Sequence, residues 1–393
     1  MNNNPIFEFS KIHTDGDSSL TDLLGGKGAN LAEMSRMGIQ VPPGFTITTE
    51  VCNYFMEHGE LPDSLEKDIK RSVQKLEEYS GKQFGGDGTP LLLSVRSGGK
   101  ISMPGMMDSI LNIGLNDDNV GKLADTFDDE RFALDSYRRL IQMYSNVVLG
   151  LEHDRFEAVI ANKKRMDNVV SDGDFNVDQL NWIIDAFKNT VERFSKAPFP
   201  QDPQEQLLGA VEAVFASWLN DRAVTYRKIN NIPDAWGTGA TVQTMVFGNL
   251  NEKSGTGVAF SRNPSNGEKE LYGEYLMNAQ GEDVVAGIRT PLPLNKKVGT
   301  DGNSLEANHP DAFKEIRDIS DKLETHFKDV QDIEFTIENE KIFLLQTRKA
   351  KRTAQASVKI AIDMVNEGVI SKEEGLLMVD ANNITNLLHP QFV

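Results

Sequence analysis

The sequence predicts an α+β protein. Residues 332–337 alternate polar and apolar side chains, which is the period of a half-buried strand, and residues 343–348 suit its partner strand. Residues 113–200 instead carry apolar positions amid charges at helical spacing. Residues 1–112 mix short strands with helices, and residues 240–348 return to strands. The chain is therefore expected to contain a helical part and parts that contain strands.

Length and composition favour two or three compact units in a soluble globular protein. The chain has 393 residues, of which 39% are hydrophobic and 25% charged. No apolar run approaches the length of a membrane span, and the first residues do not resemble a signal peptide. The single cysteine, Cys52, excludes an internal disulfide and is compatible with a reducing cytoplasm, where we place the protein. Its surroundings favour a buried structural thiol.

The charge balance excludes one class of partner. The formal net charge is −18, from 41 basic and 59 acidic residues. Because a nucleic-acid binder needs a basic face, this balance argues against such a function. An anionic substrate would need a locally basic pocket, bound cations or backbone amides.

Proline and helix-capping patterns divide the chain. Three prolines between residues 197 and 203 mark a boundary, and a strong amphipathic helix follows them. Two helical segments are expected after Arg348, the second opened by a capping-box pattern at residues 371–374. The chain ends without an obvious closing element, so a longer protein is expected. The segments predicted in this way are 1–112, 113–200, 201–245, 246–350 and 351–393.

The segment between residues 332 and 348 predicts a β-hairpin with a polar face. Asp332 and Glu334 share one face of the first strand, and Gln346 and Arg348 share one face of the second. Carboxylates two residues apart on a strand lie about 7 Å apart at Cα, so their oxygens can converge on one or two Mg²⁺ ions. The alternative is a solvated outer face with an ordinary arginine–acid pair.

Two glycine-rich segments suit phosphate groups. Lys27 stands among glycines ahead of a helix predicted over residues 29–37, where free backbone amides and the helix dipole favour anions. The Walker A spacing is absent, and a plain turn with a surface lysine is the alternative. Further along, a buried strand is expected to end at Arg96, which can clamp a phosphate bidentately. It opens into a glycine- and serine-rich loop whose methionines can also pack on the core.

Taken together, these motifs resemble the pyruvate phosphate dikinase family. The resemblance runs from about residue 20 to the C-terminus and is highly specific. The matching segments are residues 25–34, 41–49, 94–98, 102–108, 137–139, 243–248, 278–285 and 343–348.

The resemblance implies an ATP-grasp nucleotide-binding fold with a helical insertion and a C-terminal helical linker. Residues 1–112 would form the first lobe, 113–200 the helical insertion and 201–245 the return to the first lobe. Residues 246–350 would form the second lobe, and 351–393 a linker toward a phosphohistidine domain.

The resemblance also implies the residues of a Mg-ATP site. By motif match, Asp332 and Glu334 would hold Mg²⁺, and Arg96 and Arg348 would act in catalysis. Lys100 stands where the family pattern has an arginine, and keeps the charge without the guanidinium fork. The residues implied to contact ATP are Lys27, Arg96, Gly98, Gly99, Ser102, Met103, Gly105, Gln346 and Arg348, with Gln243 and Met245 expected beside the adenine.

The family converts ATP, phosphate and pyruvate to AMP, pyrophosphate and phosphoenolpyruvate. Its first stage moves the β- and γ-phosphates together to a histidine on a swivelling central domain. Neither that histidine segment nor the pyruvate-binding barrel is found in this sequence. The chain is therefore expected to bind Mg-ATP without completing the reaction alone. The expected partners are ATP and these two domains of a full-length enzyme, for which a homodimer is left open; no nucleic acid or membrane is expected.

Two other readings stay open. A phosphoenolpyruvate-synthase-like dikinase uses water as the second acceptor, but its loop pattern after Val-Arg differs from the one at residues 97–105. A non-catalytic nucleotide sensor could use the same binding residues to regulate a partner.

Overall fold

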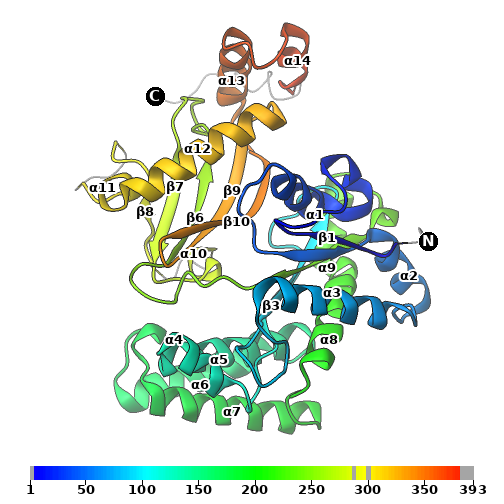
Figure 1. Cartoon of the computed structure of the whole chain (residues 1–393), viewed down its shortest axis with the longest axis vertical. Coiled ribbons are helices and arrows are strands. Elements are labelled where there is room, and N and C mark those ends of the chain that lie inside the picture. The colour runs from blue at the N-terminus through cyan, green and yellow to red at the C-terminus, as the bar shows by residue number, and fades with distance from the viewer. Residues whose placement is uncertain (1–3, 286–288, 298–301, 381–393) are drawn as a thin grey trace. The chain divides into compact units, whose positions relative to one another are not determined.

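The structure is a computed structural model that describes residues 4–285, 289–297 and 302–380. The chain forms two compact units (Figure 1). Unit 1 comprises Met1–Gly38 and Pro42–Met245, and unit 2 comprises Ile39–Val41 and Val246–Val393. Each unit contains helices and one antiparallel sheet, so the expected mixture of helices and strands is confirmed. Within the described ranges, no helix is both long and apolar enough to cross a membrane.

The sheet of unit 1 has five antiparallel strands in the order β1-β2-β5-β3-β4. Every residue of β5 is buried, because this strand lies at the centre of the sheet. The strands are β1 Ile6–Phe9, β2 Gly44–Ile47, β3 Leu93–Gly99, β4 Ser109–Ile113 and β5 Thr238–Thr244.

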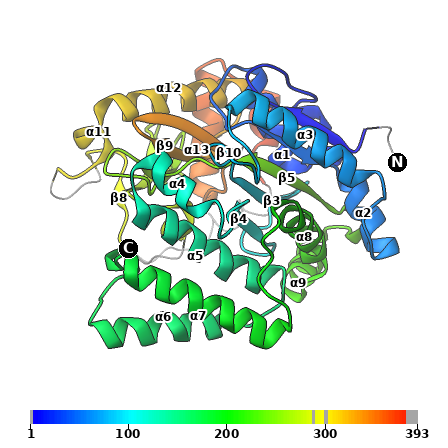
Figure 2. The same ribbon diagram turned by 60° about the horizontal axis from the view of Figure 1, so that its bottom comes forward.

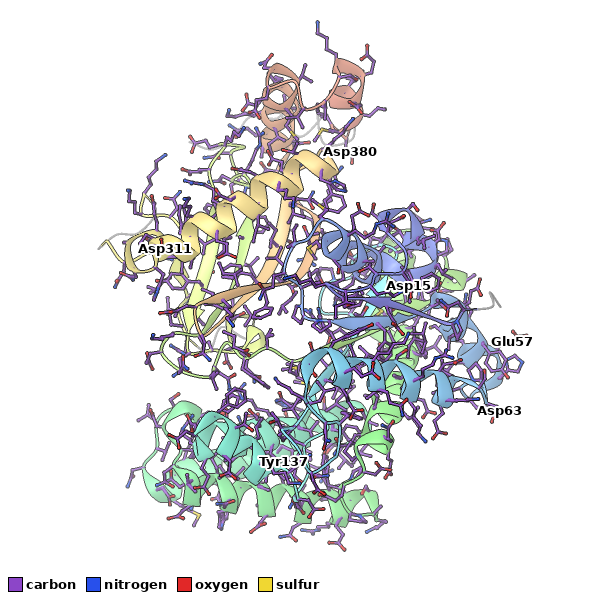
Figure 3. All side chains as sticks on the ribbon, in the orientation of Figure 1. Asp15, Glu57, Asp63, Tyr137, Asp311 and Asp380 are labelled. Atoms are coloured by element: carbon purple, nitrogen blue, oxygen red, sulfur yellow. The ribbon has the colours of Figure 1, made fainter. Side chains whose placement is uncertain are left out.

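The helices of unit 1 fall into a set around the sheet and a set formed by the middle of the chain. α1, α2 and α8 pack on the sheet, whereas α5 and α7 lie side by side, as Figure 2 shows. Figure 3 labels Tyr137 within this second set. The amphipathic helix predicted after the proline-rich boundary is confirmed by α8, whose apolar face is buried. The helices are α1 Thr21–Arg36, α2 Thr49–His58, α3 Leu65–Ser80, α4 Val120–Phe127, α5 Glu130–Val147, α6 His153–Asp167, α7 Val177–Ser195, α8 Pro203–Ala216 and α9 Asp221–Ile229.

Unit 2 is built on a second antiparallel sheet, in the order β10-β9-β6-β7-β8. Helix α12 lies across it and contacts β9 and β10 (Figure 1). Ile333 and Phe335 are fully buried, as are Ile316 and Leu323 of α12, so the predicted apolar face forms a core. The elements are β6 Gly255–Phe260, β7 Tyr272–Met277, α10 Gly281–Val285, β8 Leu292–Pro293, α11 Leu305–Asn308, α12 Pro310–Phe327, β9 Gln331–Glu338, β10 Lys341–Lys349, α13 Ala354–Asn366 and α14 Lys372–Leu377.

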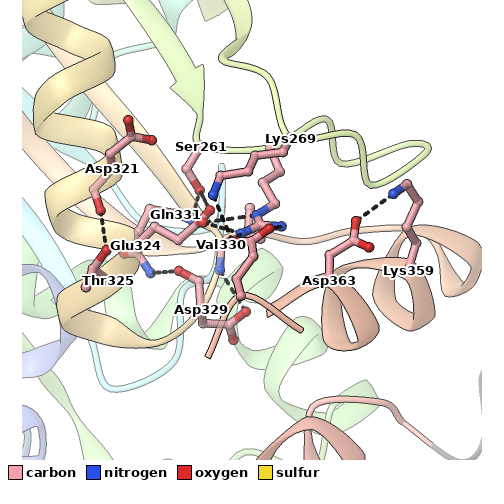
Figure 4. Close-up of polar contacts among 12 residues, drawn as sticks. Ser261, Lys269, Asp321, Glu324, Thr325, Asp329, Val330, Gln331, Lys359 and Asp363 are labelled. Atoms are coloured by element: carbon pink, nitrogen blue, oxygen red, sulfur yellow. Dashed lines mark hydrogen bonds and ion pairs between the residues drawn. The ribbon is translucent and has the colours of Figure 1, made fainter. Parts of the chain in front are cut away.

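Buried ion pairs and an apolar cluster attach α13 to this unit. Arg262, which follows β6, is fully buried and donates to Glu324 of α12 and to Glu367 at the end of α13. Figure 4 shows Ser261 and Glu324 in the same group, where the Ser261 hydroxyl donates to the carboxylate at 2.6 Å. Ala356, Ile360 and Met364 of α13 join Val330 in one hydrophobic cluster. Both predicted helical segments after Arg348 are present, and the capping box that opens α14 is confirmed.

Candidate functional site

The hairpin that the alternating pattern predicts is confirmed as β9 and β10. Its turn consists of Asn339 and Glu340, between the paired residues Glu338 and Lys341. Both turn residues have positive φ, 48° and 68°. Such a two-residue turn matches the right-handed twist of the strands, although it usually carries Asn-Gly or Asp-Gly.

A β-bulge then places the four predicted polar side chains on one face. Leu344 pairs with Phe335, but the register shifts by one residue before Gln346. As a result, Gln346 lies opposite Glu334 and Arg348 lies opposite Asp332. Because directly opposed residues project to the same face, the bulge moves Gln346 and Arg348 onto the face of the carboxylates.

Asp332 on this face has a buried carboxylate of which one oxygen is paired with an arginine. Its side chain is only 7% exposed, and its Oδ2 accepts from Nε of Arg348 at 2.7 Å. Its Oδ1 is buried without a hydrogen-bond partner in the described chain. Burial raises the pKa of Asp332 and outweighs the opposing effect of the Arg348 guanidinium. The burial of Asp332 contradicts the solvated outer face considered as an alternative, whereas the arginine–acid pair of that alternative is present.

The environment of Asp332 fits a metal ligand. A buried polar atom without a partner costs about 1–3 kcal/mol, more when it is charged. A cation bound to Oδ1 would remove this cost. Within the described ranges, no group of three or more His, Cys, Asp or Glu side chains could hold a metal. A site with two carboxylates suits Mg²⁺, which completes its coordination with water and phosphate oxygens. It does not suit a metal whose ligands all come from the protein.

In unit 1, the segment around Lys27 differs from the expectation. The helix does not begin near residue 29: α1 already begins at Thr21 and is broken at Gly25, where φ is 68° and ψ is 166°. The break starts a new helical segment at Gly26, so Lys27 and Gly28 lie in its first turn. The N-terminus of a helical segment favours anions.

Strand β3 also runs further than predicted. It does not end at Arg96 but continues through Gly98 and Gly99, which pair with Gly239 and Thr238 of β5. Sequence reasoning missed this because glycines so often open a loop. A Cβ on Gly98 would lie 3.0 Å from Cβ of Lys27. Since Arg96 is two residues away on the strand, Arg96 and Lys27 lie on the same side of the sheet.

The loop after β3 packs on the core through its methionines. Met103 is buried with Trp218, and Met106 and Met107 pack against the same cluster. Lys100 pairs with Asp22 and lies over the ring of Trp236, 4.7 Å from its centroid. Thus the core-packing interpretation of Met103 is confirmed.

Not every residue of this loop is held by the core. Gly105 has a φ of 70°, and among the residues that the structure describes none outside its immediate chain neighbours has an atom within 4 Å of its missing Cβ. Ser102, which directly precedes the buried Met103, is half-buried.

The two residues expected beside an adenine lie at the end of the first sheet. Gln243 belongs to β5 and is 1% exposed. Its Nε2 donates to the carbonyl oxygen of Pro42 at 2.9 Å, so the fold already uses this donor. Met245 is half-buried, and its amide donates to Leu92.

Gln280, a buried polar side chain, was not singled out from the sequence as a candidate functional residue. Gln280, between β7 and α10, is 5% exposed, and neither its Oε1 nor its Nε2 has a partner in the part of the chain that the structure describes. The surrounding Asn-Ala-Gln-Gly sequence is typical of a turn and carries no signal of burial.

Comparison with known proteins extends these observations. A family model described as "Pyruvate phosphate dikinase, AMP/ATP-binding domain" matches residues 21–78, 58–300 and 294–369. The chain is 50% identical over 390 residues to "Pyruvate, phosphate dikinase" of Rhizobium meliloti, which covers 98% of this chain and 43% of that protein. The corresponding protein of Clostridium symbiosum is 51% identical over 380 residues, 96% of this chain and 43% of the relative.

A plant relative shows the same coverage. "Pyruvate, phosphate dikinase 1, chloroplastic" of Oryza sativa is 47% identical over 388 residues, which are 98% of this chain and 40% of that protein. The chain therefore spans less than half the length of these curated relatives.

Proposed function

Since this chain belongs to the pyruvate phosphate dikinase family, we propose that it binds Mg-ATP and forms the nucleotide-binding part of such an enzyme. The observation that carries the proposal is the carboxylate of Asp332, which one arginine holds at Oδ2 while the buried Oδ1 has no partner in the described chain. The match to an AMP/ATP-binding family model over most of the chain supports the same ligand.

Asp332 and Glu334 would hold the Mg²⁺. When bound, Mg²⁺ neutralises phosphate charge and orients the phosphate oxygens. Arg348 favours the ionised form of Asp332, although burial outweighs it, and holds the Asp332 Oδ2 in place. The Arg348 guanidinium and the Gln346 amide lie opposite the carboxylates and would bind phosphate oxygens.

Unit 1 offers a second set of phosphate-binding groups. Lys27 and Arg96 lie at one side of its sheet, and the backbone amides that follow the break at Gly25 are next to Lys27 in the sequence. Together these groups would neutralise and orient a transferring phosphoryl group, so preorganised positive charge is the main catalytic contribution expected of this chain. The loop at residues 97–105 would cover the triphosphate, and its backbone would come close to the phosphates at Gly98, Gly99, Ser102, Met103 and Gly105.

We assign the fold to the ATP-grasp class, with residues 113–200 as a helical insertion. In the full-length protein, the bound ATP would transfer its β- and γ-phosphates to a histidine of a separate domain, and a pyruvate-binding domain would complete the reaction. The isolated chain would then bind Mg-ATP but form no phosphoenolpyruvate.

Calorimetric titration of ATP into the chain, with Mg²⁺ and with a chelator, tests the proposal. We expect saturable, Mg²⁺-dependent binding by the parent and a loss of about tenfold or more in Asp332→Ala/Glu334→Ala, because phosphate charge is then no longer balanced by the cation. Asp311→Ala/Glu315→Ala removes the same charge from exposed positions of α12 and should bind like the parent. Equal binding by both double variants would place the metal elsewhere, and a folded parent that binds no ATP would refute the proposal.

A further inference from the structure

Gln280 presents an unsatisfied amide inside unit 2. Both polar atoms of its side chain are buried without a partner in the described ranges, although its backbone amide is held by Asp283 at 2.8 Å. A buried amide without hydrogen bonds is unfavourable, because it has lost its bonds to water and gained none from the protein. Such a cost is tolerated where a ligand supplies the missing partners.

A second buried acceptor lies in the same neighbourhood. The amide of Ala279 donates to the carbonyl oxygen of Gly248 at 3.0 Å, so Gln280 and Asn249 directly follow the two ends of this contact. Oδ1 of Asn249 is also buried without a partner in the described part of the chain. Two neighbouring residues with unpaired buried amide atoms indicate a polar binding place rather than an isolated defect in packing.

The sheet register places this polar region relative to the carboxylates. A Cβ on Gly281 would lie 3.9 Å from Oγ1 of Thr256, so the backbone beside Gln280 passes close to Thr256. Thr256 pairs with Thr336 of β9. Because residues of a strand alternate between faces, Thr336 lies on the face that carries Asp332 and Glu334.

The spacing along β9 suits an extended nucleotide. Thr336 is four residues from Asp332, which corresponds to about 13 Å along a strand. The region beside Gln280 therefore lies about 13 Å along the sheet from the carboxylate that would bind the metal. This separation is comparable to the distance between the phosphates and the base of an extended nucleoside triphosphate. Gln243, the other amide considered for the base, already donates its nitrogen to Pro42.

We infer that Gln280 recognises the nucleobase of the bound nucleoside triphosphate, an inference that rests on the nucleotide site proposed above. A primary amide offers one acceptor and two donors, so it can accept from the exocyclic amino group of adenine and donate to the adjacent ring nitrogen. Guanine presents a carbonyl oxygen and an N–H at the equivalent edge. Gln280 would thus bind the edge of the adenine base through a bidentate pair.

The variant Gln280→Leu separates base recognition from phosphate binding. We expect its affinity for Mg-ATP to fall by about 5- to 100-fold, the range typical of a bidentate amide–base pair. Its affinity for Mg-tripolyphosphate, which has no base, should not change. Gln355→Leu makes the same replacement at an exposed position of α13 and should alter neither.

Thermal unfolding without nucleotide tests whether the amide serves the fold instead. Replacing an unsatisfied amide by an apolar side chain of similar shape is expected to leave stability unchanged or to increase it. Lower stability of Gln280→Leu, together with unchanged affinity for ATP, would overturn the inference.

A charge variant tests the chemistry of recognition. Gln280→Glu can only accept hydrogen bonds when ionised, so it should lose the bond to the adenine ring nitrogen and gain the two N–H groups of guanine. We expect the ratio of GTP to ATP affinity to rise at least about tenfold. An unchanged ratio in a folded variant would exclude Gln280 as the base-reading residue.

Failure of this inference is distinguishable from failure of the proposed function. If the parent bound neither Mg-ATP nor Mg-tripolyphosphate, the nucleotide site itself would be refuted. If the parent bound both and Gln280→Leu behaved like Gln355→Leu, only the assignment of Gln280 would fall.

Discussion

Gly25 packs so closely on Gly98 that a Cβ at Gly25 would lie 1.6 Å from the carbonyl oxygen of Gly98. This contact joins the break in α1 to the end of β3. Gly25 also has a φ of 68°, which side chains rarely adopt. Two separate requirements for glycine therefore coincide at the residue that positions Lys27.

Replacing Gly25 by alanine should disrupt this contact. We expect Gly25→Ala to lower the free energy of unfolding by about 3 kcal/mol or more, because the obstacle is backbone and cannot rotate away. Affinity for Mg-ATP should fall as well, since the first turn after the break would shift. Urea unfolding and calorimetry measure the two effects.

The matched control is Gly59→Ala. Gly59 ends α2 with a φ of 78°, but no atom of the described residues outside its immediate chain neighbours lies within 4 Å of its missing Cβ. This variant carries the backbone strain without the collision and should cost only about 1 kcal/mol. Equal costs for the two variants would show that the close packing on Gly98 contributes nothing.

Asp332 predicts a pH dependence of stability that Mg²⁺ should reverse. Burial holds the pKa of Asp332 above its usual range, so the folded chain binds this proton more tightly than the unfolded chain does. The stabilisation is therefore present at low pH and is lost as pH rises through the raised pKa. Relative to Asp332→Asn, which does not titrate, the metal-free parent should be less stable at neutral than at mildly acidic pH.

Saturating Mg²⁺ should stabilise the parent at neutral pH and have little effect on Asp332→Asn. Urea unfolding of both proteins at the two pH values, with and without Mg²⁺, provides the comparison. A stability difference that did not change with pH would contradict the argument about burial.

In the hairpin, the strand β9 could be predicted from the sequence, but the bulge in β10 could not. Alternation over residues 332–337 correctly predicted β9 and its buried apolar face, because period-two burial depends on the strand alone. The bulge was not predicted, although Leu344 and Leu345 break the alternation. Continued pairing from Leu344 would have turned Gln346 toward the apolar face.

Long-range contacts account for the other differences. Gly98 and Gly99 remain in β3 because β5 pairs with them, and no local pattern reveals a partner strand about 140 residues away. The break at Gly25 likewise depends on Gly98. The two neighbours of Gln280 contact residues far away in the sequence, Ala279 at Gly248 and Gly281 at Thr256, so the local sequence indicates only a turn.

Cys52 should be unreactive in the folded protein. It is fully buried, and burial raises the pKa of its thiol to about 12. Since the thiolate is the reactive form, labelling by a thiol reagent at mildly alkaline pH should require unfolding. Labelling followed in increasing urea should accelerate through the unfolding transition. Rapid modification of the folded chain without denaturant would show that Cys52 is accessible.

The buried guanidinium of Arg262 should make a large contribution to the packing of α13. Burial alone would lower the pKa of Arg262, but hydrogen bonds to Glu324 and Glu367 hold it above its usual range, so the group stays charged. Arg262→Met would leave Glu324 buried without its cation. We expect it to lower the free energy of unfolding by about 3–5 kcal/mol and to speed hydrogen exchange of α13 amides.

Lys359→Met provides the surface comparison on the same helix. Lys359 pairs with Asp363 at 2.5 Å, but its side chain is 45% exposed (Figure 4). Exposed pairs of this kind contribute about 0.3–0.5 kcal/mol, so this variant should unfold and exchange nearly like the parent. Adding Glu324→Gln to Arg262→Met should restore part of the lost stability, because the second change removes the uncompensated charge. A loss in Arg262→Met as small as that in Lys359→Met would show that the apolar cluster alone holds α13.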